Sequence, residues 1–234
     1  MNPSEIKELH NVCKALGELK SQQTESLPHD GNQALFFEND EISTGLINNK
    51  TEIKIHLLTG QLLYFHNEEG HFIDLTKDNI QEKLSIILKK YSLKMPEIKL
   101  DNVKHGQLSQ FYGYAIKAKR TIELFRMTLS GNFTLAHIWP HHFDFSVEWF
   151  TGKNDQQIGT GISPGDEQYN EPYLYMIPHP FNPEVTQYNL PIGKWHTSSW
   201  KGIKVERSDL GNYSQTEVSD LLSQLFLISK KNFE

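Results

Sequence analysis

The chain has 234 residues, which suits one large domain or two small ones and is long enough to bury a core. A net charge of −6 and an isoelectric point near 6.0 argue against a nucleic-acid-binding protein, because such a protein would carry a basic patch. The sequence has no apolar run of about 18 residues and opens without a basic region before an apolar one, so we expect neither a membrane span nor a signal peptide.

A single cysteine, Cys13, excludes an internal disulfide and a thiolate metal site. Its neighbours Val12 and Ala15 are apolar, which favours a buried and unreactive thiol. This cysteine usage predicts a protein of the reducing cytoplasm.

The first half of the chain predicts two helices with strands between them. Apolar residues at helical spacing indicate one helix over 4–20 and another over 78–91. Alternating residues on both sides of a Thr-Gly turn predict a β-hairpin made of 52–58 and 61–66. A further strand is expected over 34–42.

The second half opens with a long helix, expected at about 107–127. Strands are then predicted over 133–138, 143–150 and 171–178, and a last amphipathic helix over 216–229. Together these elements predict an α+β fold, with a mostly antiparallel sheet and helices packed on one face.

We interpret residues 1–234 as a single domain in which the two halves follow a similar order of elements. Residues 36–45 align without gaps on 143–152, with Phe, Glu, Thr and Gly coinciding. This pattern favours two duplicated halves, 1–104 and 128–234, joined by the long helix. Their half-sheets would then meet in one continuous sheet.

The stretch 137–144, His-Ile-Trp-Pro-His-His-Phe-Asp, concentrates side chains that can do chemistry. From Phe143 onward apolar and polar residues alternate, as in a strand with one buried face. The alternation places His142, Asp144 and Glu148 on the polar face. The competing interpretation is a face exposed to water, because antiparallel sheets often have one.

Further short motifs are spread over nearly the whole chain, among them Leu9-His10, Gly45-Leu46, Phe143-Asp144, Trp149-Phe150-Thr-Gly152 and Glu171-Pro172-Tyr173. In these motifs the chain resembles the bacterial domain-of-unknown-function family 5996. Many members have aromatic and small residues in place of Trp139-Pro-His-His142, so the resemblance implies that a role for the histidine pair would belong to a subgroup. It implies no activity.

Aromatic residues are dense between positions 133 and 200, where all four tryptophans lie. Tyr and Trp beside a few polar groups are typical of a pocket for an organic ligand. The sequence therefore predicts a small-molecule site in the C-terminal half, with a ligand of undetermined identity. The candidate ligand-binding residues are His137, Trp139, His142, Asp144, Tyr173, Tyr175 and His179.

One alternative is a metal-dependent, hydrolase-like enzyme, because His, Asp and Glu are ligands of zinc, manganese and iron. The candidate ligands of a divalent transition metal are His137, His142 and Asp144, and the candidate catalytic residues are Asp166 and Glu171. Under either hypothesis, one pocket should gather His137, His142, Asp144, Glu171, Tyr173 and His179.

A second alternative is a structural or interaction protein without a small ligand, which a long apolar strand edge would favour. The sequence leaves open which of these functions applies, whether the protein is an enzyme, and its oligomeric state.

Overall fold

The computed structural model describes residues 3–166 and 168–234. The α+β class and the antiparallel pairing expected from the sequence are confirmed. The strands form two sheets, however, and the expectation of one continuous sheet is wrong. Along the chain, two helices lie between the first five strands and the later strands. The hairpin connections that pair the first five strands therefore do not continue into the later ones.

The chain divides into two compact units. We call residues 3–115 together with 137–143 the N-terminal unit, and residues 116–136 together with 144–234 the C-terminal unit. Each is described by itself below.

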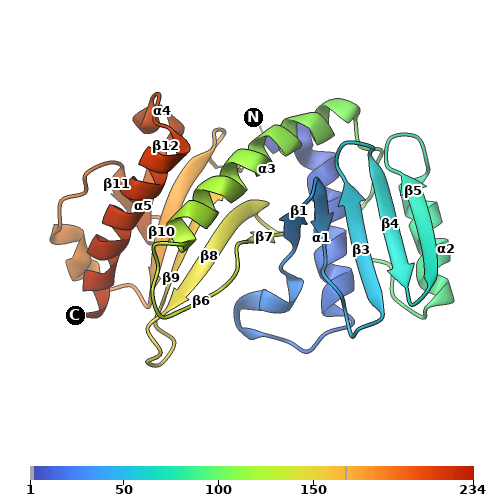
Figure 1. Ribbon diagram of the computed structural model, residues 1–234, viewed down its shortest axis with the longest axis horizontal. Helices are drawn as coiled ribbons and strands as arrows, with labels where there is room; N and C mark the ends of the chain where they lie inside the picture. Colours follow the sequence, from blue (N-terminus) through green and yellow to red (C-terminus); the bar gives the residue numbers. More distant parts are fainter. Residues whose placement is uncertain (1–2, 167) are drawn as a thin grey trace. The chain divides into compact units, whose positions relative to one another are not determined.

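The N-terminal unit contains an antiparallel sheet in which neighbours along the chain are also neighbours in space (Figure 1). Its strands are β1 (Phe36–Glu38), β2 (Glu41–Ser43), β3 (Thr51–His56), β4 (Gln61–His66) and β5 (Glu69–Asp74). In β3 buried and less buried residues alternate strictly, which confirms the predicted hairpin of β3 with β4.

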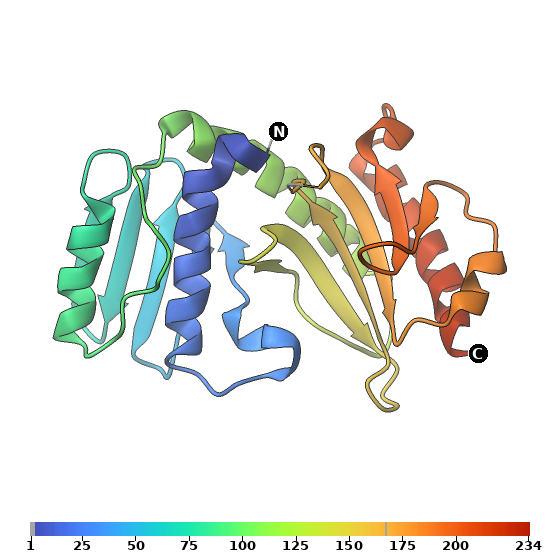
Figure 2. The same ribbon diagram turned by 180° about the vertical axis from the view of Figure 1, so that it is seen from behind.

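Helices α1 (Lys7–Ser21) and α2 (Ile80–Lys90) lie in front of these strands in Figure 2. Their apolar stripes are buried, as the helical spacing predicted. The ring of Tyr91, which ends α2, stacks on Tyr64 of β4 at a centroid distance of 5.3 Å. Short 3₁₀ helices, η1 (Pro3–Ile6) and η2 (Pro28–Gln33), flank α1.

The long helix α3 (His105–Arg126) follows, close to its expected bounds. The C-terminal unit then has an antiparallel sheet in the order β11-β12-β10-β9-β8-β6. Its strands are β6 (Asn132–Phe133), β8 (Asp144–Phe150), β9 (Gln157–Ser163), β10 (Tyr173–His179), β11 (Lys194–His196) and β12 (Gly202–Glu206).

Helix α5 (Gln215–Lys230) covers the apolar face of the C-terminal sheet. Phe226 of α5 meets Trp149 of β8 edge to face at 5.2 Å, and Trp149 lies on the same side of β8 as Phe145 and Val147. A capping box of Ser214 and Glu217 begins the helix. The remaining helical segments of the unit are η3 (Pro183–Gln187), α4 (Arg207–Leu210) and η4 (Lys231–Phe233).

The short strand β7 (His137–Trp139) and the turn after it belong to the N-terminal unit. Ile138 and Leu35 exchange two backbone hydrogen bonds, of 2.9 and 2.7 Å. The His10 ring of α1 donates from Nε2 to the Pro140 carbonyl at 2.8 Å. Phe143 stacks between the rings of His10 and Phe111, with centroid distances of 4.8 and 4.0 Å. These contacts hold residues 137–143 against α1.

The ten-residue correspondence between the two halves has no counterpart in local structure. Residues 36–45 form the β1–β2 hairpin, whose turn residues Asn39 and Asp40 have positive φ, whereas 144–150 is one continuous strand. Each half does run helix, antiparallel strands, helix. The single domain and the duplication therefore stay predictions.

Gly17 of α1 gives a first test of how residues 137–143 are held. A Cβ at Gly17 would lie 2.6 Å from Pro140 Cγ, so Gly17→Ala should lower the free energy of unfolding by roughly 1–3 kcal/mol. Gly113→Ala in α3 is the matched control, because a Cβ there meets nothing within 4 Å. It should stabilise by roughly 0.5–1 kcal/mol. Urea denaturation measures both, and equal effects of the two changes would refute this packing.

His10 gives a second test, through pH. Burial, helped by Lys14, lowers the pKa of His10 to about 4 from 6.5. Below pH 6.5 the unfolded chain takes up a proton that the folded imidazole excludes. The free energy of unfolding should therefore fall by roughly 1–3 kcal/mol as the pH drops from 6.5 to 4. His10→Phe keeps a ring on Phe143 and cannot titrate, so urea denaturation should show this slope reduced. An unchanged slope would contradict the assignment.

Candidate functional site

Residues 137–143, which hold the three histidines of the stretch 137–144, belong to the N-terminal unit. His137 is buried and meets Trp139 edge to face at 4.7 Å, while His141 and His142 are exposed. Phe143 has a φ of +60°, so the backbone turns there and β8 begins only at Asp144. The predicted strand was one residue too long, and His142 does not share the polar face of β8 with Asp144.

The predicted convergence of the C-terminal residues is also wrong. Tyr173 and His179 occupy opposite ends of the seven-residue strand β10, which separates them by roughly 20 Å. Glu171 precedes that strand and is exposed, as is His179. Asp144, Tyr173, Tyr175 and Asp166 remain, and the structure brings these four into one region.

Among the residues that the structure describes, no group of three or more His, Cys, Asp or Glu is placed to hold a metal ion. The candidate ligands His137, His142 and Asp144 therefore rest on the sequence pattern alone.

The face of the C-terminal sheet opposite α5 carries polar and aromatic side chains. Strand register places Ser146, Gly161, Tyr175 and Lys204 in one row across β8, β9, β10 and β12. Side chains in one row of a sheet share a face. In Figure 2 this face is turned toward the viewer and α5 lies behind the strands.

The Tyr175 side chain extends over Gly161 of β9 and reaches Asp144 of β8. Its hydroxyl donates to the Asp144 carboxylate, and Asp144 is only 2% exposed. Burial, and next the negative charge of Asp144, raise the pKa of Tyr175 well above its usual value. The phenol therefore stays a protonated donor at neutral pH.

Asp166 is held by the backbone and in turn receives Tyr173. Its Oδ1 accepts from the backbone N–H groups of Gln168 and Tyr169 at 2.7 and 2.8 Å. The Tyr173 hydroxyl donates to Asp166 Oδ2 at 3.0 Å. Burial raises the pKa of Tyr173, so this phenol also keeps its proton.

Lys204 places a buried cation among these rings. It is 5% exposed, and its Nζ lies 3.5 Å from the ring centroid of Tyr169 and 5.4 Å from that of Tyr173. A carboxylate oxygen of Glu206 lies 3.3 Å from the same Nζ. Cation–π attraction and one ion pair thus compensate the charge.

His196 completes the region. Its Nδ1 lies 2.7 Å from the Trp200 carbonyl oxygen, which can only accept, so Nδ1 carries the hydrogen. In this tautomer Nε2 accepts from the hydroxyls of Tyr169 at 2.5 Å and Ser198 at 3.0 Å. The Trp200 ring stacks on the imidazole at 4.0 Å.

We call these side chains the aromatic–polar cluster: Asp144, Asp166, Tyr169, Tyr173, Tyr175, His196, Trp200 and Lys204. Tyr169, His196, Trp200 and Lys204 were not among the site residues expected from the sequence. The alternation of Gly202, Lys204 and Glu206 with Ile203 and Val205 was a signal that could have found Lys204. His196 and Trp200 lie around a loop without periodicity, so no local pattern indicates them.

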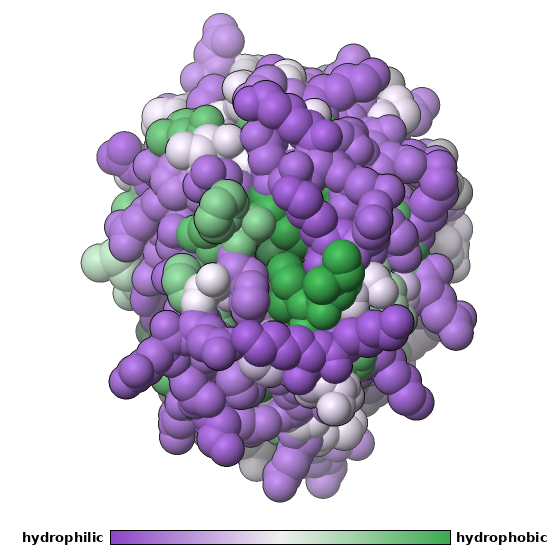
Figure 3. Space-filling view, turned by 90° about the vertical axis from the view of Figure 1, so that its right-hand side faces the viewer, coloured by the Kyte–Doolittle hydropathy of each residue, from purple (hydrophilic) through white to green (hydrophobic). Residues whose placement is uncertain are grey.

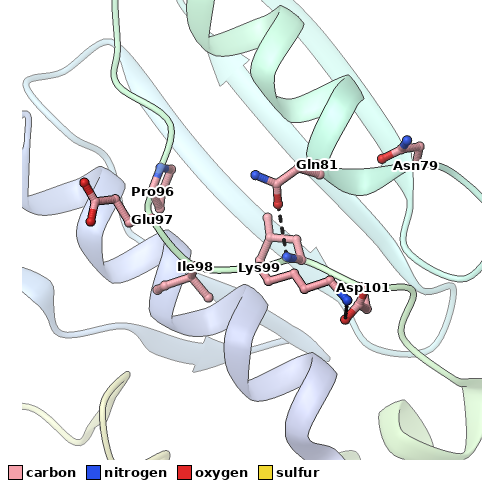
Figure 4. A pocket seen from close by; sticks show the side chains of 8 residues that line it. Asn79, Gln81, Pro96, Glu97, Ile98, Lys99 and Asp101 are labelled. Carbon is pink, nitrogen blue, oxygen red and sulfur yellow. Dashed lines mark hydrogen bonds and ion pairs between the residues drawn. The ribbon is translucent and has the colours of Figure 1, made fainter.

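The N-terminal unit contains a depression (Figure 4). It is open to solvent and is lined by Asn79, Gln81 and residues 96–101. Gln81 accepts from the Leu100 backbone N–H at 3.0 Å, and Lys99 pairs with Asp101 at 2.8 Å. An exposed ion pair and a tethering amide give this hollow no evident chemistry.

In comparisons with family models, curated proteins and solved structures, nothing matches this chain. No helix among the described residues is both long and apolar enough to cross a membrane.

Gly161 and Gly159 of β9 give a graded test of the polar face. A Cβ at Gly161 would overlap the phenol ring of Tyr175, whereas one at Gly159 meets the carboxylate at the end of the Glu148 side chain. Gly161→Ala should therefore destabilise by roughly 3 kcal/mol, and Gly159→Ala by about 1 kcal/mol. Urea denaturation of both variants measures the two losses of unfolding free energy. A larger loss for Gly159→Ala than for Gly161→Ala would show that Tyr175 does not lie across β9.

Proposed function

We propose that this protein binds a small organic molecule at the aromatic–polar cluster. The observation that carries the proposal is the burial of ionisable side chains beside stacked rings. Asp144, Lys204 and His196 are 2%, 5% and 8% exposed. Buried titratable groups with defined partners gather at functional sites more often than elsewhere.

The ligand that fits this chemistry is planar and partly aromatic, with hydrogen-bonding groups. Trp200 and Tyr173 stack with nearly parallel rings, 6.4 Å apart at 14°, and both are partly exposed. Polar side chains that reach solvent, Ser198, Ser199 and Gln168, lie in the two loops next to them. Rings with a few polar groups at the rim are typical of ligand sites.

The interaction-protein alternative draws on the edge strand β5. Its residue Phe72 is 69% exposed, and Figure 3, which views the α2 and β5 side, shows hydrophobic surface framed by hydrophilic residues. If β5 paired with its own copy along its whole length, Glu69 would face Asp74. Like charges directly opposite destabilise a strand pair, so this edge disfavours self-association.

Two further expectations from the sequence concern the family and the location of the protein. Membership in the bacterial family 5996 would give the site no activity, so that resemblance neither supports nor opposes ligand binding. The expectation of a cytoplasmic location rests on the use of a single cysteine, Cys13, in the sequence.

A library of planar aromatic fragments, screened by saturation-transfer NMR against the full chain, tests the proposal. Trp200→Ala should abolish most of the binding seen with the unmodified protein. Trp195→Phe is the control, because Trp195 is in register with Ile203 on the other side of the sheet. Loss of binding in both variants alike, or no binding in the unmodified protein, would exclude the cluster as the ligand site.

A further inference from the structure

Ser198 and His196 form a hydroxyl–imidazole pair that a binding site does not require. Ser198 Oγ lies 3.0 Å from His196 Nε2, and Ser198 is exposed whereas the His196 ring is buried. A reactive serine needs this combination, with an accessible oxygen and a base held in place behind it.

The imidazole is oriented by a third group. Its Nδ1–H donates to the Trp200 carbonyl, and the Trp200 ring stacks on its face, so both the tautomer and the ring plane are set. The lone pair of Nε2 is thereby directed at hydroxyl groups. The hydrogen bonds run from the nucleophile to the base and from the base to an orienting group, as in serine-dependent acyl transfer. Here the orienting group is a backbone carbonyl.

We propose that Ser198 is a nucleophile, activated by His196, that cleaves carboxylic esters bound at the aromatic–polar cluster. The inference rests on the proposed ligand site and names the class of molecule that the site takes, an ester with a planar aromatic part.

The first half of the reaction transfers the acyl group to serine. Ser198 Oγ forms a bond to the ester carbonyl carbon, the carbonyl π electrons move to oxygen, and the hydroxyl proton passes to His196 Nε2. The tetrahedral intermediate collapses, the bond to the alkoxy group breaks, and the alcohol leaves with the proton from Nε2. Water then repeats the sequence, releasing the carboxylic acid and restoring the Ser198 proton.

Tyr169 shares the base in the resting state. Its hydroxyl lies 2.5 Å from Nε2 and can accept as well as donate. When Nε2 takes the proton from Ser198, the Tyr169 oxygen can accept a hydrogen bond from the imidazolium. Tyr169 is thus a positioning residue in this proposal.

A fluorophosphonate probe tests the nucleophile directly. Treated with the probe, the full chain should gain one phosphonyl group, with loss of fluoride, and peptide mapping should locate it at Ser198. Ser198→Ala should not be labelled. Ser208→Ala is the matched control, since that serine is also exposed but lies in α4, outside the aromatic–polar cluster, and it should label at the rate of the unmodified protein.

Hydrolysis of 4-nitrophenyl acetate supplies the second readout. Ser198→Ala and His196→Asn should each lower the rate by about 100-fold or more, because each removes one partner of the nucleophile–base pair. A thermal melt verifies that both variants fold. Absent labelling, labelling elsewhere, or unchanged hydrolysis in Ser198→Ala would overturn the proposal.

The two proposals fail in different ways. If aromatic fragments bind in the NMR screen but Ser198 is not labelled, the chemistry is wrong and the ligand site stands. If Ser198 is labelled but no fragment binds, the nucleophile stands without the ligand site.

Discussion

The missing side chain at Gly161 is the constraint on which the polar face of the C-terminal sheet depends. Tyr175 extends over the β9 backbone to Asp144, and the position that a Cβ would take at Gly161 is filled by the phenol. Because the ring occupies that space, two strands that do not pair with each other are joined by a side-chain hydrogen bond. Gly161 of β9 thus serves the packing of Tyr175.

Burying the charged side chains of the aromatic–polar cluster costs free energy. Removing an ammonium or a carboxylate from water costs several kcal/mol, which partners must compensate. Lys204 has Glu206 and the Tyr169 ring, and Asp144 has the Tyr175 hydroxyl. An exposed pair such as Lys99 with Asp101 adds little by comparison. Asp144 and Lys204 lie on the same face of the C-terminal sheet, so both of these costs fall on that face.

The sequence predicted regular elements well, because burial follows periodicity. The β3–β4 hairpin and α3 are examples. The prediction of where β8 begins was wrong, because it depends on one backbone torsion. The positive φ of Phe143 excludes His142 from β8, and the pattern of apolar residues does not indicate that torsion. The sequence did indicate Tyr173 and Tyr175 as candidate site residues. It could not find His196, whose partners lie up to 27 residues away along the chain.

The stacking of Phe143 between His10 and Phe111 also constrains how the chain is made. Pro140 and Phe143 pack against α1 from about 130 positions further along the chain, so the N-terminal unit stays incomplete on the ribosome until residue 143 has emerged. Contacts of such sequence separation slow folding. For the same reason no single cut of the chain releases either unit whole, and a fragment that ends at residue 115 would expose the α1 surface that residues 137–143 cover.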